Sequence, residues 1–168
     1  MPVGFVAGWR IRDASGPADV AAVRRLFEEY RASLDVDLCF QDFDRELAEL
    51  PGDYAPPHGC LLVAECDGTA VGCVALRPLG GATRGGEVKR LYVQPHVRGT
   101  RLGRALAMAV IERARAIGYR ELKLDTLATM TQARALYASL GFRACAPYYR
   151  NPLPGTAYMA LALRDPEP

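Results

Sequence analysis

The residues from Glu87 to Gly103 constrain the fold of this chain most, because they run from a strand through a turn into a helix. Apolar and aromatic residues at 88–93 favour a strand, and Pro95 ends it. Gly99 then opens a turn, after which the apolar residues recur at helical spacing. The first N–H groups of such a helix are unpaired and attract anions. Three cations surround this point, Arg98, Arg101 and Arg104. The stretch therefore predicts a phosphate-binding site.

The composition excludes several classes of protein. Of 168 residues, 50% are hydrophobic and 24% charged, which predicts one globular domain over residues 1–168 with a core at about 9–163. A net charge of +2 and scattered basic residues argue against nucleic acid as a partner. No apolar run approaches the ~20 residues that cross a bilayer. The five cysteines never form Cys-x-x-Cys, which predicts a reducing, cytoplasmic location and no zinc site.

Hydrophobic periodicity and turn residues divide the rest of the chain into strands and helices. Proline in the first turn at Gly16-Pro17 suits a helix start, and Asp67-Gly68 marks a tight hairpin. We expect strands at 9–14, 60–66, 69–76, 88–93, 121–127, 142–149 and 157–163, and helices at 17–34, 43–50, 103–118 and 132–140. This interleaving predicts an α/β fold with a sheet of mixed direction.

Two short motifs, at Arg98–Gly103 and Ala133–Phe142, resemble those of the GNAT superfamily of N-acetyltransferases, in particular its small bacterial single-domain members. The first, Arg/Gln-x-x-Gly-x-Gly/Ala, falls on Arg98–Gly103. The second, Ala-x-x-Leu-Tyr-x-x-x-Gly-Phe, falls on Ala133–Phe142. A glycine pattern alone is weak, but two motifs at the family's separation, each on its expected element, are specific. The resemblance covers about residues 9–163.

The resemblance implies a mixed, mostly antiparallel sheet of six to seven strands, splayed at its centre and flanked by about four helices. The strands at 88–93 and 121–127 would form the splay, and the pantetheine arm of acetyl-CoA would lie between them. Its pyrophosphate would bind the N–H groups that follow Gly99. The residues implied for cofactor binding are Leu91, Tyr92, Val93, Arg98, Gly99, Thr100, Arg101, Leu102, Gly103, Arg104 and Tyr137.

Two residues depart from the family pattern. Arg101 stands where the first motif usually has a glycine, so the turn lacks glycine's freedom there, although the side chain can reach a phosphate. Met130 stands where many members carry an asparagine that helps to hold the cofactor. We expect the anion site to persist with altered contacts to the coenzyme.

Three groups are implied to carry the chemistry. Tyr137 matches the tyrosine that faces the cofactor sulfur, where a hydroxyl can protonate a thiolate; the alternative is a core aromatic beside Phe142. The spacing between Glu87 and Arg98 resembles that of the glutamate that acts as general base in some members of the family. An ordered water is the alternative base. The non-catalytic alternative for Glu87 is a solvated position at the end of the strand. The N–H of Val93, at an expected bulge, would stabilise charge on the thioester oxygen.

The acceptor side is predicted from position alone. Lys89 and Arg90 lie on opposite faces of a predicted strand, where solvent exposure is the favoured expectation and carboxylate binding in the cleft the alternative. The candidate wall residues, for which a place in the core is the alternative, are Phe40, Gln41, Phe43, Tyr54, Arg90, Thr126, Tyr148, Tyr149 and Asn151. His58 and His96 stand alone in predicted loops, so no metal site is expected.

The sequence therefore predicts an acetyl-CoA-dependent N-acetyltransferase acting on a primary amine of a small molecule. A peptide or protein amine as acceptor, a bulkier acyl group, and a non-catalytic acyl-CoA sensor on the same fold are the alternatives. Family members often form dimers, so a homodimer is among the partners that the resemblance implies. Neither nucleic acid nor a membrane is expected as a partner.

Overall fold

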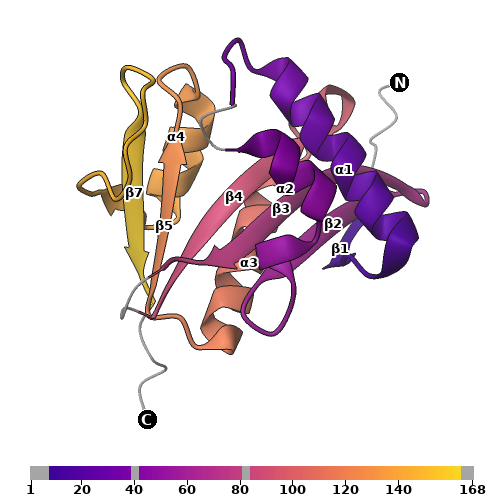
Figure 1. Ribbon diagram of the computed structural model, residues 1–168. Coiled ribbons are helices and arrows are strands. Elements are labelled where there is room, and N and C mark those ends of the chain that lie inside the picture. Colours follow the sequence, from indigo (N-terminus) through magenta and orange to yellow (C-terminus); the bar gives the residue numbers. More distant parts are fainter. Residues whose placement is uncertain (1–7, 39–41, 81–83, 164–168) are drawn as a thin grey trace.

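A seven-stranded sheet crosses the middle of the computed structural model, which describes residues 8–38, 42–80 and 84–163 (Figure 1). Its strand order is β1-β2-β3-β4-β5-β7-β6, and each neighbouring pair is antiparallel except β4 and β5. The strands are β1 (Trp9–Asp13), β2 (Cys60–Cys66), β3 (Thr69–Pro78), β4 (Gly85–Val93), β5 (Glu121–Thr126), β6 (Arg143–Ala144) and β7 (Ala157–Ala162). The predicted mixed, mostly antiparallel α/β sheet is confirmed.

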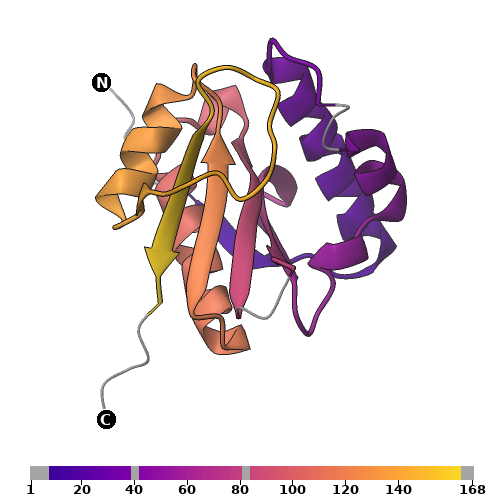
Figure 2. The same cartoon turned by 60° about the vertical axis from the view of Figure 1, so that its left-hand side comes forward.

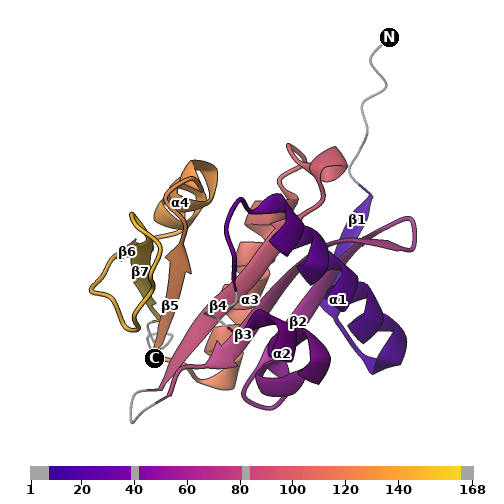
Figure 3. The same cartoon turned by 45° about the horizontal axis from the view of Figure 1, so that its top comes forward.

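Helices cover both faces of this sheet (Figures 1 and 3). One face carries α1 (Gly16–Ser33) and α2 (Phe43–Glu49), followed by the short 3-10 helix η2 (Gly52–Tyr54). The opposite face carries α3 (Leu102–Ile117) and α4 (Thr131–Ser139), which share a second core cluster. Each helix buries one apolar stripe, as amphipathic helices on a sheet do.

Local chemistry explains where the principal elements begin and end. Pro17 lies in the first turn of α1, where its missing N–H costs nothing. Gly118 ends α3 with a φ of 100° and donates its N–H to the carbonyls of Ala114 and Arg115. At the β2–β3 hairpin, Asp67 and Gly68 both have positive φ angles, 49° and 78°, which matches the predicted tight turn.

The closing part of the chain corrects one prediction. We expected a strand over 142–149, but β6 extends only over Arg143–Ala144, followed by one more backbone hydrogen bond to β7, from the Cys145 N–H to the Tyr158 carbonyl at 2.9 Å. Pro147 follows and cannot donate to a ladder. The hydroxyls of the next two residues, Tyr148 and Tyr149, instead donate hydrogen bonds to the carboxylates of Glu87 in β4 and Asp125 in β5. Figure 2 shows the loop between β6 and β7 crossing in front of β5 and β7.

The sheet divides between β4 and β5, as the resemblance implied. The two strands pair in parallel only at Gly85–Glu121, Gly86–Leu122 and Glu87–Lys123, and then diverge in a V (Figures 1 and 3). Gly86 permits the close approach at the base of this fork. A Cβ there would lie 3.0 Å from side-chain atoms of Leu76 and Tyr119 and 3.1 Å from Leu122.

Candidate active site

The phosphate-binding turn forms directly after β4. A 3-10 turn, η3 (Pro95–Val97), leads into Gly99 and Arg101, whose φ angles are 82° and 66°. Thr100 steadies the turn by donating its hydroxyl to the carbonyl of Val97 at 2.7 Å. Arg101, where the family motif usually has glycine, therefore adopts the left-handed conformation that favours glycine.

The N-terminus of α3 is arranged to receive an anion. No side chain caps it and no acidic residue lies in its first turn, all residues of which the structure describes. Its unpaired N–H groups and the helix dipole therefore face outward with Arg98, Arg101 and Arg104 around them. The open space at Gly103, whose nearest neighbour to an added Cβ is a Val93 methyl at 3.9 Å, lets a ligand approach the backbone.

A groove leads from this turn into the fork. Arg98 and Gly103 stand at its outer end, and one wall is the strand from Leu91 to Val93. The other wall comes from the start of α4, including Met130, Ala133 and Leu136. Backbone groups on one side and apolar side chains on the other suit a long, flexible arm with amide groups.

The groove continues into an inner pocket between β4 and β5. Four residues line both spaces, namely Tyr30, Leu91, Met130 and Ala133. The inner pocket is lined further by Leu38, Val88, Lys89, Arg90, Asp125, Thr126, Leu127 and Tyr137. A molecule held along the groove would place its inner end beside charged and hydroxyl-bearing side chains.

Tyr137 lies on α4 with its ring packed edge-to-face on Phe142, the two centroids being 5.5 Å apart. The side chain is 7% exposed and lines the inner pocket. Burial raises its pKa well above the usual value for tyrosine, with smaller contributions from Tyr30 and Asp125. The hydroxyl therefore stays protonated at neutral pH and can donate to an anion formed in the pocket.

Glu87 is buried rather than solvated. Its carboxylate accepts a hydrogen bond from Arg77 Nε at 2.8 Å and another from the Tyr148 hydroxyl at 2.7 Å. Glu87 is 2% exposed and is not among the residues that line the inner pocket, within the part of the chain that is described. The solvated alternative is wrong, and the carboxylate is occupied on both oxygens.

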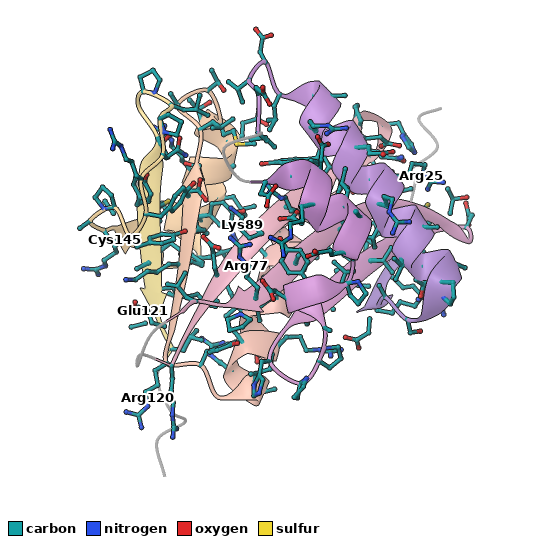
Figure 4. All side chains as sticks on the ribbon, in the orientation of Figure 1. Arg25, Arg77, Lys89, Arg120, Glu121 and Cys145 are labelled. Carbon is teal, nitrogen blue, oxygen red and sulfur yellow. The ribbon has the colours of Figure 1, made fainter. Side chains whose placement is uncertain are left out.

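Lys89 and Asp125 face each other across the fork, and Figure 4 shows the Lys89 side chain in the opening between β4 and β5. Lys89 Nζ lies 3.5 Å from Asp125 Oδ1, and their side chains are 5% and 7% exposed. The other carboxylate oxygen, Oδ2, accepts a hydrogen bond from the Tyr149 hydroxyl at 2.5 Å, with Asn151 Nδ2 at 3.5 Å. Burial lowers the pKa of Lys89, although Glu87 and Asp125 oppose that shift.

Arg90 is also buried, so the expectation that it and Lys89 face solvent is wrong. Its guanidinium donates to both carboxylate oxygens of Glu46 at 2.8 and 3.1 Å and lies 4.7 Å from the ring centroid of Phe43. Lys89 and Arg90 are consecutive and yet both line the inner pocket, because the strand bulges at Arg90 and Leu91.

The bulge lies earlier in β4 than we predicted. Ala75 pairs with Lys89 and Cys73 with Tyr92, so Val74 stands opposite two residues, Arg90 and Leu91. Arg90 has a φ of 59°, as one residue of a bulge often does. Val93 lies beyond the irregularity and pairs with Gly72. The bulge was placed at Val93 on family resemblance, and the residue types of the strand gave no signal for its position.

The remaining predicted wall residues separate into two groups. Thr126 lines the pocket and accepts a hydrogen bond from Arg134 Nε at 3.2 Å. Tyr149 and Asn151 bind the pocket residue Asp125, whereas Tyr148 binds Glu87, outside the described lining. Phe43 and Tyr54 pack around Phe27 in the core, which was the alternative that we predicted for them. Phe40 and Gln41 lie outside the described residues.

Among the charged residues in the described lining of the pocket, Asp125 is the one that our sequence reasoning missed. In β5 it lies between Leu124 and Thr126, which are buried, so the alternation of a strand predicts that its carboxylate faces outward. The available signal was its place near the carboxyl end of the strand that flanks the predicted splay.

In the described ranges, no cluster of three or more His, Cys, Asp or Glu could hold a metal ion. None of the described helices is long and apolar enough to cross a membrane.

Comparison with known proteins agrees with this geometry. The profile of the Acetyltransferase (GNAT) family matches residues 21–142. This chain belongs to the GNAT acetyltransferase family. It is an acetyltransferase.

Similar proteins extend over most of this acetyltransferase. An uncharacterized N-acetyltransferase of Schizosaccharomyces pombe is 45% identical over 88% of this chain and 90% of its own length. The uncharacterized N-acetyltransferase YjgM of Escherichia coli is 33% identical over 79% of each chain. A GNAT-family acetyltransferase structure from Staphylococcus aureus aligns with a TM-score of 0.75 at 17% identity, covering 93% of this chain and 99% of that one. That last likeness shows a shared fold.

Proposed function

We propose that this acetyltransferase moves the acetyl group of acetyl-CoA directly to the primary amine of a small molecule. The observation that carries the proposal is the inner pocket of the fork, which Tyr30 and Leu38 line together with the charged side chains of β4 and β5. A pocket set between two strands and under α1 suits a compact acceptor better than a peptide. The cysteine pattern supports a cytoplasmic location as part of the same proposal.

The residues along the groove fit the donor. The N–H groups after Arg101 would hold the pyrophosphate with Arg98 and Arg104, and the backbone of Leu91 and Val93 would hold the pantetheine arm. When bound, acetyl-CoA supplies an activated acetyl group as a thioester. The fork would hold the amine and the thioester side by side, and positioning of this kind supplies much of a transfer rate.

Three groups of this chain would assist the transfer. Tyr137 would give a proton to the departing sulfur, since its raised pKa keeps the hydroxyl protonated. A backbone N–H would stabilise charge on the carbonyl oxygen, for which Val93 is the predicted donor and the bulge at Leu91 a second candidate. Of the two predicted proton acceptors we favour an ordered water over Glu87, because Arg77 and Tyr148 already occupy the Glu87 carboxylate.

The test is release of free thiol from acetyl-CoA in the presence of amino acids, polyamines, aminoglycosides or short peptides, one class at a time. We expect release that depends on one class of small amine. Release with peptides alone would favour the protein-amine alternative. Coenzyme A binding without turnover on any amine would favour a sensor and contradict the proposal.

A further inference from the structure

One arm of the fork offers a buried cation to the inner pocket and the other arm a buried anion. Lys89 comes from β4 and Asp125 from β5, with 3.5 Å between Nζ and Oδ1. Both residues line the pocket that also contains Tyr137. The two opposite charges therefore stand side by side where the acceptor would bind.

A ligand with a single charge would leave this pocket unbalanced. Transfer of an unpaired charge into a buried site carries a desolvation cost that an opposite charge must offset. A ligand that carries one ammonium and one carboxylate matches Asp125 and Lys89 together and adds no net charge. The spacing of the two side chains suits charges that belong to neighbouring carbons of one small molecule.

The neighbouring arginines are engaged elsewhere. The Arg90 guanidinium binds Glu46 through two of its nitrogens, and Arg77 binds Glu87. Each of these cations already has a carboxylate at hydrogen-bonding distance. Glu46, which holds Arg90, lies outside the described lining of the inner pocket, whereas Lys89 and its partner Asp125 both line it. Lys89 is thus the cation that meets the substrate together with an anion of the same pocket.

Asp125 is placed to hold the ammonium end. Its Oδ2 accepts a hydrogen bond from the Tyr149 hydroxyl at 2.5 Å, which fixes the carboxylate, while Oδ1 lies 3.5 Å from Lys89 Nζ. An ammonium bound there lies in the same pocket as the Tyr137 ring, where the thioester sulfur is proposed to sit.

We propose that the acceptor is a small zwitterion, an α- or β-amino acid or a close relative, whose carboxylate binds Lys89 and whose ammonium binds Asp125. This assignment rests on the proposed N-acetyltransferase function and names the substrate class of the same site. Lys89 is a specificity residue in this scheme. Asp125 positions the ammonium, which becomes the attacking amine once the ordered water has taken its proton, while the departing sulfur takes a proton from Tyr137.

Matched acceptors test the assignment. Each amino acid is compared with its amide and with the amine that lacks the carboxyl group, by thiol release from acetyl-CoA. We expect the wild-type kcat/KM to favour the acid at least tenfold over its amide. Lys89→Met should reduce this ratio to near one, and Lys89→Arg should retain part of it. The KM for acetyl-CoA should stay within about twofold, because Lys89 lies beyond the groove that holds the coenzyme.

Lys123→Met is the matched control, since Lys123 lies on β5, pairs with Glu121 at 3.3 Å and does not line the pocket in the described structure. It should leave the acid-to-amide ratio unchanged. If Lys89→Met fails to fold, as judged by its melting curve, Lys89→Arg and the double variant Lys89→Met/Asp125→Asn, which removes both charges, carry the test.

Equal turnover of acids and amides by the wild-type protein would overturn the assignment while leaving the N-acetyltransferase proposal intact. So would a Lys89→Met variant that loses activity equally on both kinds of acceptor. Absence of turnover with any amine, despite coenzyme A binding, would instead contradict the proposed function and the assignment with it.

Discussion

At the scale of single residues, the side chain of Tyr137 is both buried and part of the inner pocket, as the proposed proton donor to the departing sulfur should be. We predict that Tyr137→Phe lowers kcat about 10²-fold, the lower end of general-acid contributions, with little change in the KM for acetyl-CoA. The ring and its contact with Phe142 are retained, so the melting temperature should hardly change. Steady-state thiol release and a thermal melt measure both quantities.

Tyr119→Phe is the control for that substitution, because the Tyr119 hydroxyl binds the carbonyl of His58 and the residue lines neither the groove nor the inner pocket of the described structure. A Tyr137→Phe enzyme with wild-type kcat would assign Tyr137 to the core alone.

Glu87 offers a second residue-scale prediction. We predict that Glu87→Gln lowers the free energy of unfolding by about 1–3 kcal/mol, because a buried, charge-assisted hydrogen bond to Arg77 is weakened. The kcat should fall no more than about threefold if water accepts the proton. Denaturant unfolding and thiol release separate the two effects. A loss of kcat of about a hundredfold or more with unchanged stability would restore Glu87 as the general base.

At the scale of elements, the turn before α3 shows how closely sequence and structure correspond. The strand, the glycine and the helical spacing were readable in order, because each depends on local preferences. The length of the closing strand was not, because the tyrosines after Pro147 bind Glu87 and Asp125, which are distant in sequence. The bulge beside Arg90 and the pocket-facing position of Asp125 likewise depend on partners from other strands.

Arg101 allows a test of that turn. Arg101→Gly should raise the free energy of unfolding by about 1 kcal/mol, because glycine adopts a φ of 66° without the penalty of a side chain. The same change removes a cation from the phosphate-binding turn, so the Kd for coenzyme A should rise, more at low salt than at high salt. Unfolding curves and calorimetric titration check the two parts. A destabilised variant would show that the Arg101 side chain contributes more than its backbone strain costs.

The junction of β1 and α1 carries a pH-dependent contribution. Hydrogen bonds from Arg12 lower the pKa of Asp19 from 3.8 to about 2, with help from the backbone N–H of Ser15. Because the folded-state pKa is the lower one, ionised Asp19 stabilises the fold fully above about pH 4, and this contribution is lost as the pH falls towards 2. We predict that Asp19→Asn lowers the melting temperature at neutral pH and that the difference from wild type shrinks between pH 4 and pH 2. A difference that persists unchanged at pH 2 would point to packing rather than charge.

At the scale of the whole molecule, the sheet consists of β1–β4 on one side and β5, β7 and β6 on the other, joined by three residue pairs. A ligand in the fork would contact both parts. We predict that saturating coenzyme A slows amide hydrogen exchange in β4 and β5 together, and at 100-fold excess over its Kd stabilises the protein by about 2.7 kcal/mol. Mass-spectrometric exchange with and without coenzyme A measures this. Protection confined to the turn before α3 would place only the phosphates, and not the arm, on the protein.

The divergence of β4 and β5 leaves two strand edges turned towards each other without a ladder between them. A sheet normally avoids such edges, because unpaired peptide groups invite any extended chain to join them. If the amide-bearing arm of the donor lies there as proposed, the fold reserves a place for a strand that its own sequence does not encode. The donor would then be a structural part of the finished sheet, and each turnover would remove and replace it.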